Sequence, residues 1–160
     1  MFEVSRQFKC LKGQLVYSRR DRGFDFFPDG DFDQGVLGSQ EGTTSLAGSA
    51  IQIEVSVGDG RILYPWGYCP QVSWETSTVR LPQAQAGAVL DKSLIGELVP
   101  GVSIRLVPDL ARVKYDPTAG VVWIASGVAT RDVVTIADGV CIGLADGAVS
   151  DLWLVPEFRD

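Results

Sequence analysis

Apolar and polar residues alternate along several short stretches of this chain. In the clearest stretch, residues 51–57, Ile or Val occupies every second position and polar residues stand between them. A period of two with one polar face is typical of an antiparallel strand that covers a core on one side only. A Gly-Asp-Gly turn at 58–60 leads into a second alternating run at 61–69. Pro65 and Gly67 place that second strand at a sheet edge or give it a bulge.

Turns separate many further apolar runs, because the chain holds 18 Gly and 8 Pro. The Asp-Gly pairs at 138–139 and 146–147 lie between apolar runs, so they predict two hairpin turns and a C-terminal meander of short strands. Asp116-Pro117 followed by Gly120 predicts another hairpin. The further strands expected from these runs are 77–81, 102–107, 111–115, 121–125, 132–136, 140–144 and 148–155.

One short helix is expected near 91–98. Asp91 is a suitable N-cap, apolar residues recur at helical spacing from Leu90 to Leu98, and Pro100-Gly101 ends the run. The patterns together predict a mainly β protein: an antiparallel sandwich or half-open barrel with a C-terminal meander and this one helix.

The length of 160 residues favours a single domain, 1–160. Within it we expect an N-terminal hairpin region at 2–27 and a main β body at 51–156. Residues 34–50 are rich in Gly, Ser and Thr and show little periodicity, so the sequence predicts a long loop there.

A series of turn and strand motifs runs through residues 114–155. The motifs are Tyr115-Asp116, Gly120-Val121-Val122-Trp123-Ile124, Asp138-Gly139-Val140, Asp146-Gly147 and Leu152-Trp153-Leu154. The series resembles a family of very short bacterial β-meander proteins of unknown function, which usually have Asp where this chain has Gly120. The resemblance implies a twisted antiparallel meander. It implies no activity, because none is attached to the family.

The composition is that of a folded, acidic protein with 46% hydrophobic residues and a net charge of −6. The negative charge argues against nucleic acid or an anionic membrane as the partner. No apolar run is long enough for a membrane-spanning helix. The chain contains no His, which excludes Ser-His-Asp triads, Cys-His dyads and zinc sites that use His.

The three cysteines, Cys10, Cys69 and Cys141, lie far apart in the sequence and form no CxxC motif. We expect reduced and mostly buried thiols. Because the N-terminus also lacks a signal-peptide pattern, the sequence predicts a cytoplasmic protein. Cys69 has no neighbouring base to activate it, so we expect it to be structural.

The acidic segment 24–35 is a candidate metal or partner site. Asp29, Asp31 and Asp33 stand at alternate positions, as in the first half of a calcium-binding loop. Such a loop needs Gly where this chain has Gln34 and a bidentate Glu where it has Gln40. We therefore expect no metal site and no cofactor, and treat the three aspartates as part of an acidic binding surface.

The aromatic segment 64–74 is a candidate binding surface of a different kind. Tyr64, Trp66, Tyr68 and Trp74 are interleaved with Pro and Gly. They could form a stacking platform for a sugar or an anchor for a protein. Because the first three alternate, we expect at least two of the four aromatic rings to pack in the core.

No residue is assigned a catalytic role, since no nucleophile motif, phosphate loop or dinucleotide motif is present. The sequence favours a non-enzymatic cytosolic binding protein, in its sharpest form an acidic partner that neutralises a basic protein, as immunity proteins do. The alternative is a β module that binds a sugar or another small ligand through the 64–74 segment. A carboxylate-dependent enzyme is the third hypothesis.

Overall fold

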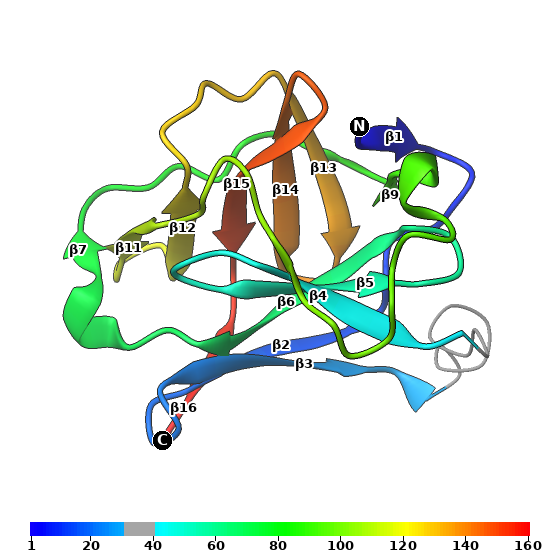
Figure 1. Cartoon of the computed structure of the whole chain (residues 1–160). Coiled ribbons are helices and arrows are strands. Elements are labelled where there is room, and N and C mark those ends of the chain that lie inside the picture. Colours follow the sequence, from blue (N-terminus) through cyan, green and yellow to red (C-terminus); the bar gives the residue numbers. More distant parts are fainter. Residues whose placement is uncertain (31–40) are drawn as a thin grey trace.

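Two seven-stranded sheets pack against each other in the structure, a computed structural model that describes residues 1–30 and 41–160 (Figure 1). The apolar side chains that the two sheets bury belong to one core cluster. The strands of one sheet run across those of the other in Figure 1. The mainly β fold is therefore confirmed, and its arrangement is that of a sandwich.

The first sheet has the order β10-β4-β5-β6-β3-β2-β16. Its strands are β2 (Gly13–Ser18), β3 (Gly23–Pro28), β4 (Thr43–Ala47), β5 (Gln52–Ser56), β6 (Ile62–Tyr68), β10 (Ile104–Arg105) and β16 (Glu157–Arg159). The β2–β3 hairpin ends at Pro28, one residue beyond the hairpin region expected at 2–27, and β5 and β6 match the two alternating runs. The outermost strands, β10 and β16, pair in parallel with β4 and β2.

The second sheet has the order β7-β11-β12-β15-β14-β13-β8. Its strands are β7 (Glu75–Thr76), β8 (Gln85–Ala86), β11 (Arg112–Asp116), β12 (Val121–Ala125), β13 (Asp132–Ala137), β14 (Val140–Ala145) and β15 (Ala148–Leu154). Asp138-Gly139 and Asp146-Gly147 form the turns between β13, β14 and β15, so the C-terminal meander is confirmed. A small third sheet pairs β1 (Glu3–Ser5) with β9 (Ala88–Leu90).

The long loop expected over 34–50 is wrong for its second half. Residues 43–47 form β4, which pairs with β5 along its whole length. The apolar pattern did not predict this strand, because hydroxyl side chains occupy several of its positions. The Thr44 hydroxyl donates to the carbonyl of Val102, and the Ser45 hydroxyl donates to Glu54. Once these polar groups are satisfied, they can be buried at strand positions.

The helix expected near 91–98 is reduced to a 3₁₀ helix, η4 (Lys92–Leu94). Asp91 is its N-cap, as predicted, and its carboxylate accepts the backbone N–H of Ser93. The chain leaves the helix at the C-cap Ile95, whose ψ of 122° is extended, and Gly96 follows with a positive φ of 85°. A second 3₁₀ helix, η3 (Gln71–Ser73), follows β6.

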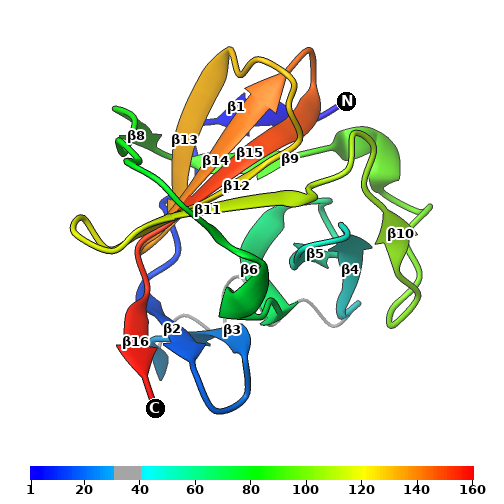
Figure 2. The same ribbon diagram turned by 90° about the vertical axis from the view of Figure 1, so that its left-hand side faces the viewer.

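The strand expected at 77–81 is absent, and its residues belong to a connection that we call the strap, residues 77–84. The strap links β7 at one edge of the second sheet to β8 at the other edge. Figure 2 shows it crossing the face of this sheet that points away from the first sheet. The buried side chain of Val79 packs there on Val121, Cys141 and Trp153. The N–H of Val79 donates to the Asp116 carboxylate instead of to a neighbouring strand.

The turn between β5 and β6 is clamped against the segment after β9 by Gly60. This residue has a positive φ of 70°, its carbonyl accepts the N–H of Asp91, and a Cβ at Gly60 would lie 2.3 Å from the Asp91 carbonyl oxygen. Gly120 has nearly the same φ, 71°, but a Cβ there meets no atom within 4 Å.

We therefore expect two different costs for the same substitution. Gly120→Ala should lower the free energy of unfolding by about 1–2 kcal/mol, the cost of a left-handed backbone for an L-residue. Gly60→Ala should cost a further amount of about 1–3 kcal/mol, because the new Cβ must displace packed backbone. Urea denaturation of both variants measures the difference. Equal losses would show that the clamp at Gly60 is not as tight as the structure has it.

Candidate functional site

The four aromatic residues singled out from the sequence do not form one surface. Trp74 packs into a cluster of aromatic rings between the sheets, where it lies 4.8 Å from Tyr17 between ring centroids. Tyr64 is stacked on Phe26, Trp66 is half-buried, and Tyr68 is 65% exposed. The expectation that at least two rings pack inside agrees with Tyr64 and Trp74, which both contact the core.

The acidic residues are only partly described. Asp29 is exposed at the end of β3, while Asp31 and Asp33 lie outside the described residues. Within residues 1–30 and 41–160, no three His, Cys, Asp or Glu side chains come together as a metal site would require. Two aspartates of the meander turns have partners: Asp138 pairs with Lys12 at 3.5 Å and Asp146 with Arg131 at 3.4 Å.

A row of paired residues crosses the outward face of the second sheet. Strand register places Trp123 of β12 opposite Trp153 of β15. On either side of these two, Lys114 of β11 is opposite Trp123, and Cys141 of β14 is opposite Trp153. The two indole rings are parallel within 2°, with centroids 6.3 Å apart, and the Lys114 ammonium lies 5.3 Å from the Trp123 ring centroid. The ammonium is therefore placed for a cation–π contact.

The next row of paired residues leaves open space beside the indoles. It consists of Arg112, Ala125, Asp151 and Gly143 on β11, β12, β15 and β14. Ala125 is too small to fill the face of the sheet, whereas Thr130 and the Trp153 ring already fill the space over Gly143. A Cβ at Gly143 would lie 2.9 Å from Thr130 and 3.1 Å from the Trp153 ring, so no larger residue fits there without displacement.

These residues border a pocket of about 350 Å³, which we call the tryptophan pocket. The two indoles and Ala125 come from the sheet, Arg112 and Lys114 stand at its β11 side, and the loop 127–130 supplies the other wall. Trp153 exposes only 9% of its surface and Trp123 is half-buried, so Trp123 offers more aromatic surface to a ligand than Trp153 does.

Asp151 fixes the geometry of the tryptophan pocket. Its Oδ1 accepts the Nε1–H of Trp123 at 3.0 Å and its Oδ2 accepts the Thr130 hydroxyl. The Thr130 and Ser150 hydroxyls are also hydrogen-bonded to each other, at 2.7 Å. Because the buried carboxylate already has partners on both oxygens, it orients the Trp123 ring and the loop.

Sequence reasoning assigned Trp123 and Trp153 to strands of the meander but gave them no binding role. Both lie in apolar runs, which is the ordinary signature of a buried strand. The strand pairing that brings them together with Arg112, Lys114 and Asp151 is a long-range property. The one local signal was the alternation of Arg112 and Lys114 with apolar residues, which marks an outward-facing side of β11.

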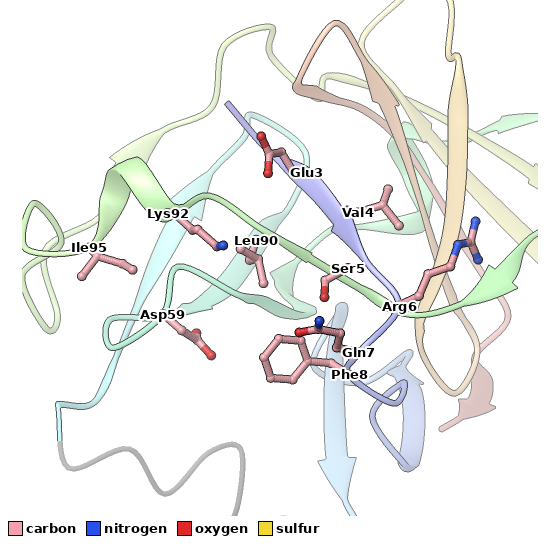
Figure 3. Close-up of a pocket in the computed structure, with 10 residues that line it drawn as sticks. All are labelled: Glu3, Val4, Ser5, Arg6, Gln7, Phe8, Asp59, Leu90, Lys92 and Ile95. Atoms are coloured by element: carbon pink, nitrogen blue, oxygen red, sulfur yellow. The ribbon is translucent and has the colours of Figure 1, made fainter.

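A second pocket, of about 560 Å³, lies at β1 and the segment after it; we call it the N-terminal pocket (Figure 3). Residues 3–8 form one wall, and Asp59, Leu90, Lys92 and Ile95 form the other. In Figure 3 the Phe8 ring points toward Asp59, while the Arg6 side chain points away from it. Arg6 is hydrogen-bonded to Gln85.

Comparison of the sequence with known protein families and with curated proteins finds no match in either set. The resemblance of residues 114–155 to short bacterial β-meander proteins therefore stays a prediction. No helix in the described part of the chain is long and apolar enough to cross a membrane.

All three cysteines are buried and unpaired. Burial raises the pKa of the Cys69 thiol, although the Trp74 indole donates a hydrogen bond to its Sγ at 3.3 Å and acts in the opposite direction. Burial likewise raises the pKa of Cys141. A raised pKa leaves less thiolate near neutral pH, so neither group has the character of a nucleophile.

We accordingly expect Cys69 to react slowly with a chromogenic disulfide at about pH 8, where an ordinary exposed thiol is substantially ionised. All three thiols should react at once in denaturant, which provides the internal control. Mass spectrometry of the labelled peptides assigns the sites. Rapid labelling of Cys69 in the native protein would contradict its burial and its raised pKa.

Proposed function

We propose that this chain is a non-enzymatic binding protein that holds a sugar ring, or a ring of similar size, in the tryptophan pocket. The observation that carries the proposal is the parallel pair of indoles at the pocket wall. Aromatic faces bury much apolar area at little cost in side-chain entropy, and the C–H faces of a sugar pack well on them. The ligand class agrees with the alternative drawn from the sequence, but the residues differ.

Polar groups around the indoles support the same proposal. Arg112 and Lys114 are not paired with any acidic group among the described residues, so their N–H groups are available to hydroxyl or ring oxygens. Because Asp151 holds the Trp123 ring in place, the stacking surface is ordered before the ligand arrives. A site that is already ordered loses less entropy on binding.

The pocket chemistry favours binding over hydrolysis. Glycoside hydrolysis needs two carboxyl groups about 5–10 Å apart on either side of the bond. Among residues 1–30 and 41–160, Asp151 is the one carboxylate that lines the tryptophan pocket, and both of its oxygens already accept hydrogen bonds. A cytoplasmic location is part of the proposal, since three buried thiols without a disulfide are typical of that compartment.

The proposal predicts that Trp123→Ala weakens sugar binding at least about tenfold, which corresponds to 1.4 kcal/mol. A panel of neutral mono- and oligosaccharides is titrated while tryptophan fluorescence and NMR shifts are followed. Trp66→Ala is the matched control, because Trp66 does not line the tryptophan pocket. The proposal fails if no sugar perturbs Trp123, or if the two variants lose affinity equally.

A second candidate is the acidic partner of a basic protein, and one observation favours it. On β3, Phe24 and Phe26 face the core while Asp25 and Phe27 face outward. Phe27 is 53% exposed and stands between the exposed Asp25 and Asp29. An exposed aromatic ring flanked by carboxylates matches an anchor with electrostatic steering.

This second candidate predicts that Phe27→Ala raises the dissociation rate of a captured basic protein. Asp25→Lys with Asp29→Lys should slow association, and the slowing should fade as salt screens the charges over a Debye length of about 8 Å. Asp132→Lys, an exposed charge reversal on the other sheet, is the control. If it alters binding as much as the β3 variants do, total charge and not the β3 surface determines the association.

A further inference from the structure

Arg61 is buried to an extent that is unusual for an arginine. It follows Gly60 at the start of β6 and exposes only 2% of its surface. It is bridged to Leu90 of β9, so the clamp described above holds its backbone in place. Arginine is almost never fully buried unless it is paired with an acid.

The guanidinium group of Arg61 has few partners. One N–H, at Nη2, donates to the carbonyl of Lys9 at 2.6 Å. The buried Nε has no hydrogen-bond partner. Within the described residues no carboxylate lies close enough to form a salt bridge with it. The Phe8 ring covers the group, with its centroid 5.1 Å from Cζ.

This arrangement leaves a buried positive charge without a counter-ion. Burial lowers the pKa of Arg61, and the Asp59 carboxylate, which acts from a distance, only partly opposes this. A buried charge is costly unless an opposite charge and hydrogen bonds satisfy it. An anion at the free side of the guanidinium would supply both.

Phe8 connects Arg61 to a space large enough for such an anion. The same ring that covers the guanidinium forms part of the wall of the N-terminal pocket (Figure 3). Phe8 is 39% exposed, so part of its side chain is open to solvent. A rotation of this side chain would open the pocket toward Arg61, and exposed aromatic side chains rotate readily.

We propose that the N-terminal pocket binds a small monocarboxylate, whose carboxylate pairs with Arg61 when the Phe8 ring turns aside. The planar guanidinium matches a carboxylate with two parallel hydrogen bonds. Val4, Leu90 and Ile95 line the pocket and accommodate a short apolar body.

The acidic groups of the pocket restrict the charge of the ligand. Glu3 and Asp59 line the same pocket and repel a doubly charged phosphate more strongly than a single carboxylate. Arg6 and Lys92 are the positive residues of the lining, and because the Arg6 side chain points away from Asp59, Lys92 adds the nearer positive charge. These charges favour a monoanion. This site is separate from the tryptophan pocket, so its test does not depend on the function proposed above.

The experiment titrates butanoate into the full chain and follows backbone amide NMR shifts of residues 3–9. Butanamide, which has the same shape without the charge, and inorganic phosphate are titrated in parallel. Butanoate should bind at least tenfold more tightly than either. Equal binding of butanamide would exclude a role for the Arg61 charge, and preference for phosphate would overturn the ligand class.

Two variants test the residues. Arg61→Met should weaken butanoate binding at least tenfold, whereas Arg6→Gln, which removes a charge from a lining residue whose side chain points away from Asp59, should change it less than about twofold. Phe8→Ala removes the cover and should keep or strengthen binding. Unchanged affinity in Arg61→Met would refute the proposal.

A measurement that leaves Arg61 in place covers the case in which Arg61→Met fails to fold. Phenylglyoxal modifies accessible arginines, and peptide mapping identifies them. Phenylglyoxal should modify Arg61 slowly in the native protein and faster in Phe8→Ala. Butanoate should slow the modification of Arg61. An Arg61 that butanoate does not protect would overturn the proposal as well.

Discussion

The register between β12 and β15 is the constraint on which the outer surface of the second sheet depends. It pairs Val122 with Leu154 and Ile124 with Leu152 on the core side, and Trp123 with Trp153 on the outer side. A slip of either strand by one residue would turn the indole of that strand into the core and its aliphatic residues out. The core between the sheets is already filled with packed apolar side chains, so an indole could enter it only by displacing them. Packing of the core therefore fixes what the protein presents to solvent.

Asp116 determines how much of that outer surface stays open. Its Oδ1 accepts the N–H groups of Thr118 and Ala119, which closes the β11–β12 turn, and its Oδ2 accepts the N–H of Val79 in the strap. These hydrogen bonds hold the pKa of the carboxyl below its usual value. At pH values above the pKa that Asp116 has in the unfolded chain, these hydrogen bonds contribute fully to the stability of the fold. This contribution is lost as the pH falls through the lower pKa that Asp116 has in the folded protein. The strap covers the Val121 end of the sheet, so the tryptophan pocket opens at the Ala125 end.

Local patterns were enough for the strands and turns of the meander, because alternation and Asp-Gly turns are determined by neighbours in the chain. They failed for β4, whose buried hydroxyls find partners on Val102 and Glu54. They did not show which rings of the aromatic segment are buried, because Trp74 is placed by rings from both sheets. The candidate site depends on pairings between strands that are distant in the sequence, and local patterns in a single sequence do not show which strands pair. The sequence thus predicted the mainly β fold, whereas the pairing of Trp123 with Trp153 is visible only in the structure.

The two pockets belong to different parts of the fold. The tryptophan pocket is built on β11, β12 and β15 of the second sheet, with side chains whose spacing the core fixes. The N-terminal pocket lies where β1 and β9 meet the β5–β6 turn, and there the Gly60 clamp and the buried Arg61 hold the wall together. Substitutions at sites without shared contacts act nearly independently. Arg61 faces no carboxylate partner in the described residues, whereas Asp151 has a donor on each oxygen. One site is thus electrostatically complete and offers a preformed stacking surface, while the other lacks a negative charge that a ligand can provide.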